Sequence, residues 1–259
     1  MLICMSPRLS DAVRKQMQAQ YEKDGLERMK IESALNRLFL VERSGDEQRS
    51  GLHASALMAK DEHYCPREQL LSLYFPMHEN KKELGVGTLR IFREGVAIHE
   101  KWQQMMTDGG IALACEARAL SEEYMLSLTP DVIVEIGCQR YILEIKSMNT
   151  FAFKKMTYRH PGGNDQSQIY MHFYGIPKAI ILVEDKNTQE IKTFIEHYDA
   201  DNPVLKKVIA RLEDLKEMRK VFEETGVPPK RECWYGYDDP RAVGCPMRDA
   251  CYKDCGKYE

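Results

Sequence analysis

The chain has 259 residues, of which 43% are hydrophobic and 30% charged, and its formal net charge is −3. This composition is ordinary for a globular protein with a full core, so we expect one domain with extensions, and it excludes a globally basic nucleic-acid-binding surface. No apolar run approaches the roughly 20 residues of a membrane span and no secretory signal opens the chain, so we expect a cytoplasmic protein without a membrane partner.

The first 50 residues predict a helical extension. Residues 8–42 carry apolar side chains at spacings of three and four, with a break near Gly25, and residues 43–51 are polar. We therefore divide the chain into an extension, residues 1–50, and a main domain, residues 51–259.

Residues 52–76 predict two short helices. Ser55 can cap the first, and Pro66 suits the first turn of the second. Cys65 then falls at a helix start, where free backbone N–H groups favour a thiolate. A buried free cysteine is the simpler alternative.

Residues 88–108 predict a long amphipathic helix. Its expected buried positions are Phe92, Val96, Ile98 and Trp102. His99 lies inside this helix, four residues after Gly95, and a single helical histidine is more often structural than a ligand.

Two apolar runs, Val132–Ile136 and Tyr141–Ile145, are separated by a short stretch that contains Gly137. This pattern predicts a β-hairpin. Further strands are predicted at Ala179–Glu184 and Ile191–Tyr198, and a helix from Pro203 to about Glu224. Helices before and after the hairpin indicate an α/β fold with a mixed central sheet flanked by helices.

The predicted hairpin carries a cluster of charged residues. Glu144 and Lys146 project to one side of the second strand and Ile145 to the other. If Asp131 lies beside them, one sheet edge presents two carboxylates and an ammonium. Such carboxylates suit Mg²⁺ or Mn²⁺, and the lysine can stabilise charge on a phosphate. An exposed ion pair is the alternative.

Residues 146–164 contain four Lys or Arg, one His and no acidic residue. Three aromatic residues are interleaved with them: Phe151, Phe153 and Tyr158. Cations that follow phosphates and rings that stack on bases suit single-stranded nucleic acid, although a solvated loop is an equal alternative. Gln166 and Tyr170 follow, four residues apart on one face of a predicted helix.

Four of the eight cysteines lie near the C-terminus, with the spacing Cys233-x11-Cys245-x5-Cys251-x3-Cys255. Thiols separated by short loops with Gly and Pro predict a metal clasp over residues 230–259. Loss of the metal should then unfold part of the domain. Free surface thiols are the alternative.

Pro130-Asp131 followed by Glu144-Ile145-Lys146 resembles the active site of the PD-(D/E)XK nuclease superfamily. The Gly95-x-x-x-His99 helix before the hairpin and the Gln166-x-x-x-Tyr170 helix after it resemble the RecB-type branch. Cys65-Pro66-Arg67 together with the cysteine tail is similar to the iron–sulfur members of that branch, which include the CRISPR-associated RecB-like exonucleases and the AddB nuclease domain.

This resemblance implies a restriction-endonuclease-like core with a divalent metal site. Its Mg²⁺ or Mn²⁺ ligands would be His99, Asp131, Glu144 and the carbonyl of Ile145. The implied catalytic residues are Lys146, Glu144, Asp131, Gln166 and Tyr170. His53 and His63 are less favoured substitutes for His99.

The resemblance also implies a [4Fe–4S] cluster on Cys65, Cys233, Cys245 and Cys251. Eleven residues separate Cys233 from Cys245, whereas the family usually has only two at this place. Cys233 is therefore in doubt as a ligand, and Cys255 is its rival. Structural Zn²⁺ on the four tail cysteines is the alternative, and it leaves Cys65 unused.

The implied activity is that of a metal-dependent DNA nuclease, an exonuclease acting on single-stranded ends. No G-x-x-x-x-G-K-[ST] phosphate loop is present, so it would act without a helicase of its own. Two alternatives stay open: a nucleic-acid-binding or assembly protein with a zinc-bound tail, and a structure-specific endonuclease that uses the same site.

Overall fold

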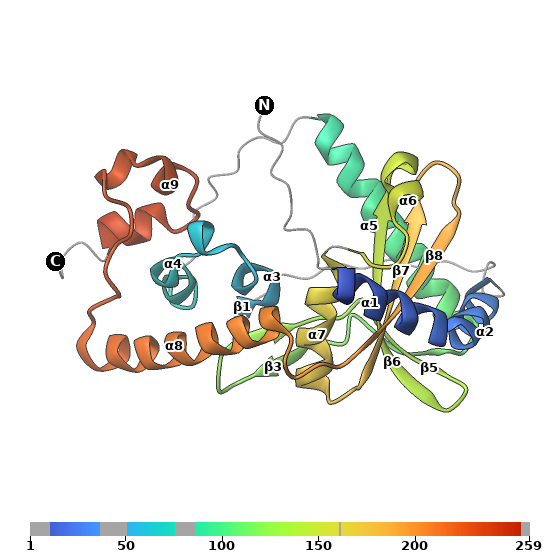
Figure 1. The fold of residues 1–259 in the computed structure, drawn as a ribbon. Coiled ribbons are helices and arrows are strands. Elements are labelled where there is room, and N and C mark those ends of the chain that lie inside the picture. The colour runs from blue at the N-terminus through green and yellow to red at the C-terminus, as the bar shows by residue number, and fades with distance from the viewer. Residues whose placement is uncertain (1–10, 37–50, 76–85, 161, 255–259) are drawn as a thin grey trace.

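A five-stranded mixed sheet forms the centre of the computed structural model, which describes residues 11–36, 51–75, 86–160 and 162–254 (Figure 1). The strand order is β2-β5-β6-β7-β8. The bounds are β2 Ala112–Cys115, β5 Val132–Ile136, β6 Gln139–Met148, β7 Lys178–Asp185 and β8 Ile191–His197. Helices cover both faces of this sheet. The predicted α/β class, with a mixed central sheet flanked by helices, is therefore confirmed.

The predicted hairpin is confirmed as β5 and β6, which pair antiparallel with Val132 opposite Leu143. β6 then pairs parallel with β7, while β2 and β8 pair antiparallel with their neighbours. The hairpin therefore lies at the centre of the sheet rather than at its edge, and its charged residues gather where β5 begins and β6 ends.

One face of the sheet is covered by α5, Val86–Asp108. Ile98, Trp102 and Met106 of this helix pack on alternate residues of β6 and β7. Phe92 and Val96, which the sequence predicts to be buried, are instead 55% exposed each. The other face is covered by α7, Gly163–Tyr174, and by the short helix α6, Thr150–Lys155, while α8, Pro203–Thr225, packs against α7.

A second sheet and several short helices complete the main domain. The small sheet has the order β1-β4-β3, with β1 Leu52–His53, β4 Leu126–Leu128 and β3 Ala119–Ser121. The short helices are α3 Ala54–Leu57, η1 Asp61–His63, α4 Pro66–Leu71 and α6 Thr150–Lys155. The N-cap of α3 is His53 and not the predicted Ser55, because the helix begins at Ala54, two residues earlier than predicted.

Two N-terminal helices, α1 Asp11–Lys23 and α2 Gly25–Asn36, pack beside the edge strand β8. Tyr21 joins the cluster around Phe194, and Ile31 joins the opposite core. An uncovered edge strand invites pairing with other chains. The predicted helical extension therefore covers this edge of the sheet.

The C-terminal segment returns to α4 after the long helix α8 (Figure 1). It contains η2 Gly236–Asp238, α9 Pro240–Val243 and η3 Ala250–Asp254. The predicted helix from Pro203 is confirmed as α8, and it is capped at both ends: Asn202 accepts hydrogen bonds from Val204 and Leu205, and Gly226 ends the helix in a left-handed conformation. Both residue types suit these positions.

Candidate active site

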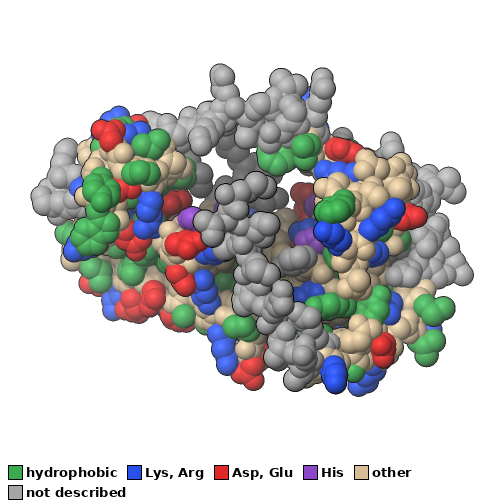
Figure 2. All heavy atoms as spheres, turned by 45° about the horizontal axis from the view of Figure 1, so that its top comes forward, with side chains coloured by type: hydrophobic (Ala, Val, Ile, Leu, Met, Phe, Trp, Pro, Cys, Tyr) green, Lys and Arg blue, Asp and Glu red, His purple; other side chains and the backbone are tan. Residues whose placement is uncertain are grey.

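A cleft of about 1040 Å³ lies between α5, α7 and the ends of β5 and β6. The space-filling view shows a hollow whose wall carries acidic, basic and histidine side chains (Figure 2). Six predicted site residues line the cleft together: His99, Asp131, Glu144, Lys146, Gln166 and Tyr170. Ile145, between two of them, points into the core instead.

Asp131 is held between two elements. Its Oδ1 lies 3.3 Å from His99 Nδ1 on α5, and its Oδ2 accepts a 2.7 Å hydrogen bond from the Ile145 amide on β6. Gln103, one turn after His99, donates to the Asp131 carbonyl at 3.2 Å. Sequence reasoning missed Gln103, although its spacing from Gly95 and His99 places all three on one helix face.

Glu144 is 1% exposed and only one of its carboxylate oxygens is used. Lys146 Nζ donates to Oε2 at 2.8 Å, whereas Oε1 is buried and has no partner among the described residues. A buried, unpaired carboxylate oxygen costs free energy unless a cation or donor occupies it. The site therefore leaves one strong acceptor facing the cleft.

Lys146 and the α7 pair form a chain of hydrogen bonds. Lys146 also donates to Gln166 Oε1 at 3.2 Å, and Gln166 Nε2 donates to the Tyr170 hydroxyl at 2.9 Å. The start of α7 is ordered by His160, whose Nδ1 accepts the amides of Gly162 and Gly163. The predicted Q-x-x-x-Y spacing thus places both side chains on the cleft face of α7.

The charges in the cleft shift one another's titration. Burial, with the charge of Asp131, raises the pKa of Glu144 to about 7. Burial alone would lower the pKa values of His99 and Lys146, but the neighbouring carboxylates outweigh it and both pKa values are raised. Such mutual perturbation in a cleft is typical of functional sites.

A buried acid on β7 fixes the position of α5. Glu184 accepts two hydrogen bonds from Lys101 Nζ, at 2.6 and 2.7 Å, and one from Trp102 Nε1 at 2.5 Å. These donors directly follow His99 on α5. Glu184 therefore anchors the helix turn that presents His99 to Asp131, a role the sequence pattern did not reveal.

The cleft supplies the donor types of a divalent-cation site. Asp131 and Glu144 contribute oxygen and His99 a nitrogen, which suit Mg²⁺ or Mn²⁺. Within the described ranges, no three His, Cys, Asp or Glu side chains stand close enough to hold an ion as placed, so binding requires them to converge. His53 and His63 do not line the cleft, and His63 pairs with Glu62 on the surface.

The four predicted cluster cysteines line a second, much smaller cavity of about 20 Å³. Cys65 precedes α4, and the other three come from the tail: Cys233, Cys245 and Cys251. Cys255 lies outside the described residues. Chain segments far apart in sequence thus bring four thiols together.

Arg67 of α4 binds the tail at this cavity, and Arg231 links two parts of the tail to each other. Arg67, which is 1% exposed, donates to the carbonyls of Pro229 at 2.6 Å and Cys251 at 3.3 Å. Arg231 donates to the Cys251 carbonyl at 2.8 Å. The residue after Cys65-Pro66 therefore has a structural role, and its positive charge favours anionic ligands nearby.

Burial raises the pKa of Cys65 to about 11 and that of Cys245 to about 12. The predicted thiolate at the start of α4 is therefore wrong for the metal-free protein, because burial outweighs the backbone hydrogen bonds that favour the anion. The enclosed volume is close to that of one water molecule. Among the described residues no three of these thiols are placed to hold an ion, so metal binding would require them to rearrange. As soft donors they suit either iron–sulfur or zinc.

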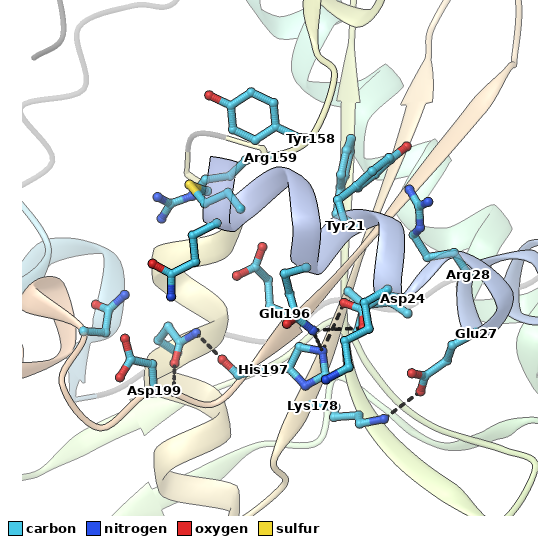
Figure 3. Close-up of a pocket in the computed structure, with 18 residues that line it drawn as sticks. Tyr21, Asp24, Glu27, Arg28, Tyr158, Arg159, Lys178, Glu196, His197 and Asp199 are labelled. Atoms are coloured by element: carbon cyan, nitrogen blue, oxygen red, sulfur yellow. Dashed lines mark hydrogen bonds and ion pairs between the residues drawn. The ribbon is translucent and has the colours of Figure 1, made fainter. Parts of the chain in front are cut away.

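A third cavity, about 780 Å³, lies between α1, α2 and β8 (Figure 3). Its charged residues pair across elements: His197 Nε2 lies 3.1 Å from Asp24 Oδ2, and Lys178 Nζ lies 2.8 Å from Glu27. Glu196 also lines it, and burial raises the pKa of this carboxyl to about 7. These contacts dock the N-terminal helices on the sheet.

No protein-family model and no curated protein matches the sequence. Chains of known structure do match, among them the crystal structure of SSO0001, with 15% identity and a TM-score of 0.43 over 86% of this chain and 94% of that one. A likeness this distant identifies neither fold nor function. Among the described residues no helix is both long and apolar enough to cross a membrane.

Proposed function

We propose that this chain is a divalent-metal-dependent deoxyribonuclease with a restriction-endonuclease-like core, of the RecB type, that acts on single-stranded DNA ends. The observation that carries the proposal is the convergence of His99, Asp131, Glu144 and Lys146 in one cleft, where a buried Glu144 oxygen has no partner within the described part of the chain. The mixed sheet with the acidic hairpin at its centre agrees with that family's implied architecture.

His99, Asp131 and Glu144 would hold Mg²⁺ or Mn²⁺, with the Ile145 carbonyl as a further ligand. Bound there, the ion would polarise a phosphate and lower the pKa of an attacking water. Ile145 lies between Glu144 and Lys146, and its amide already holds Asp131. The ligands therefore come from one hairpin and one anchored helix, which limits how far each must move.

Lys146 would stabilise negative charge that develops on the phosphate, or orient the water. Its pKa is raised by the carboxylates beside it, so it stays protonated at neutral pH. Gln166 holds Lys146 from the side opposite Glu144, and Tyr170 holds Gln166. Gln166 and Tyr170 would thus fix the ammonium and contact the DNA backbone.

The test is Mn²⁺-dependent cleavage of end-labelled single-stranded DNA by anaerobically purified protein. Wild type should shorten the strand, and Lys146→Ala should yield no product. The matched control is Lys206→Ala, which should behave as wild type. Lys206 is a surface lysine that pairs only with Asp201 in the described chain. Equal cleavage by Lys146→Ala, or no cleavage by any of the three, would contradict the proposal.

We further propose that the four thiols around Cys65 hold a [4Fe–4S] cluster as a structural clasp, with Zn²⁺ as the alternative. The four thiols at one cavity and the guanidinium groups of Arg67 and Arg231 beside them support a bound metal. Metal and sulfide analysis with the visible spectrum separates the two. If the protein contains zinc but neither iron nor sulfide, the clasp is a zinc site and not an iron–sulfur cluster. A protein that is fully folded without any metal would contradict both.

A further inference from the structure

The N-terminal half of α5 exposes apolar side chains beside the candidate active site. Phe92 and Val96 are 55% exposed each and line the same cleft as His99. The opposite face of the same helix is fully buried at Trp102. Because water contact with such side chains is unfavourable, an exposed apolar stripe next to a polar site indicates a contact with a ligand.

A second exposed ring lies on α6, the short helix that follows β6. Phe151 is 70% exposed, while Phe153 of the same helix is 3% exposed and packs under it on the sheet. α6 is firmly held: Asn149 caps its start, and Lys192 donates to the carbonyls of Phe153 and Met156 at its end. Phe151 is thus presented outward by a fixed helix.

The turn between β7 and β8 connects the two exposed regions. Asn187 Nδ2 donates to Thr150 Oγ1 on α6 at 2.9 Å, and Lys186 Nζ donates to the Ile91 carbonyl on α5 at 3.3 Å. Phe151 directly follows Thr150 in the sequence, and Phe92 directly follows Ile91. Both rings therefore flank the same end of the sheet, beyond the catalytic groups of β6.

The charge around Phe151 is positive. Lys154 and Lys155 are exposed on α6, and Lys155 Nζ lies 3.9 Å from the centre of the Phe151 ring. Residues 146–164 contain no acidic side chain to oppose them. Rings for bases and ammonium groups for phosphates are the combination that binds single strands without sequence preference.

We propose that Phe92 and Phe151 stack on unpaired bases of a single DNA strand and guide it into the cleft. β6 rises about 3.3 Å per residue, so the start of α6 at Asn149 lies roughly 10 Å from Lys146. That span corresponds to about three stacked nucleotides at ~3.4 Å each. The inference rests on the proposed nuclease function and assigns its preference for unpaired DNA to these rings.

The first experiment measures binding of a fluorescent 12-nucleotide oligothymidylate probe in a Lys146→Ala background. Loss of one stacked base weakens single-strand binding by roughly 5- to 150-fold, so Phe151→Ala and Phe92→Ala should each fall in that range. Phe151→Trp should restore binding, because it keeps a π-face. Lys155→Ala should reduce the slope of log affinity against log salt concentration by about one, the change expected for the loss of one phosphate contact.

The control is Tyr235→Ala, which removes an 84% exposed ring of the C-terminal segment that belongs to neither α5 nor α6. Equal weakening by Tyr235→Ala, or equal loss of duplex binding in Phe151→Ala, would overturn the proposal, because neither depends on stacking at the cleft. A lower melting temperature with unchanged DNA binding would also overturn it, since the ring would then be covered by another part of the chain.

The second experiment separates this inference from the nuclease proposal. Wild type, Phe151→Ala and Lys146→Ala are compared on single-stranded DNA with Mn²⁺, and KM and kcat are measured separately. Stacking predicts a higher KM for Phe151→Ala with kcat retained. Cleavage by wild type with an unchanged KM in Phe151→Ala overturns the stacking alone, whereas no cleavage by wild type overturns the nuclease function and leaves the binding test to decide the stacking.

Discussion

Two polar cavities lie against the same sheet, and their charged side chains are arranged differently. In the cleft, Glu144 meets Asp131, His99 and Lys146 at one point, and one buried carboxylate oxygen has no partner among the described residues. In the cavity under α1, Asp24 pairs with His197 and Glu27 with Lys178, each across two elements (Figure 3).

The comparison shows how geometry separates a reactive site from a docking interface. Charges that pair off one to one satisfy each other and join segments of chain. Charges that converge on one point, with a buried oxygen that has no partner among the described residues, leave capacity for a ligand. The volumes are of similar size, so the pairing of the charges, and not the size of the cavity, distinguishes the two.

The largest expected effect comes from neutralising one glutamate in each cavity, the buried Glu144 and the partly buried Glu196. Burial raises the pKa of both Glu144 and Glu196 to about 7, so they form a matched pair. Glu144→Gln should lower Mn²⁺-dependent cleavage at least about 100-fold, the scale for loss of a preorganised charge. Glu196→Gln should cleave at the wild-type rate, and a comparable loss there would erase the distinction between the cavities.

The same substitution at Glu196 should change the pH dependence of stability. The pKa of Glu196 is about 7 in the folded chain against 4.5 for an ordinary glutamate, because burial disfavours its charge. The folded state therefore binds the proton more tightly. Stability from this group is fully present below pH 4.5 and is lost as the pH rises to about 7.

Glu196→Gln carries no such titration. It should match wild type at pH 4 and exceed it at pH 8, with a free energy of unfolding higher by on the order of 3 kcal/mol. Urea unfolding at the two pH values measures this difference. The same gain at both pH values would show that the carboxyl is not buried as described.

The smallest effect should come from breaking one pair in the docking interface. His197→Ala removes one partner of Asp24, which is 7% exposed and keeps its hydrogen bond from Gln20, and should cost about 1–2 kcal/mol of stability. His197→Gln, which keeps a donor, should recover part of it. Limited proteolysis within α1 and α2 should accelerate in His197→Ala while cleavage activity is retained; loss of activity would mean that docking supports the cleft.

Local patterns in the sequence determined the elements and the spacing within each. The hairpin, the amphipathic α5, the α8 caps and the two faces of β6 follow from periodicity, proline and glycine, because these act over a few residues. Glu144 with Lys146 and Gln166 with Tyr170 are local pairs on one strand and one helix, whereas their membership of one site was implied by the family resemblance and not by periodicity.

Only the tertiary structure decided how distant segments meet. It placed Asp131 between His99 and Ile145, brought Cys65 to the tail and docked α1 on β8. These contacts join segments that are far apart in the sequence, so a local periodicity does not predict them. It also reversed the predicted burial of Phe92 and Val96. Periodicity shows that a helix has an apolar face, but the packing of Trp102 against Glu184 sets the helix rotation and leaves those two side chains in the cleft.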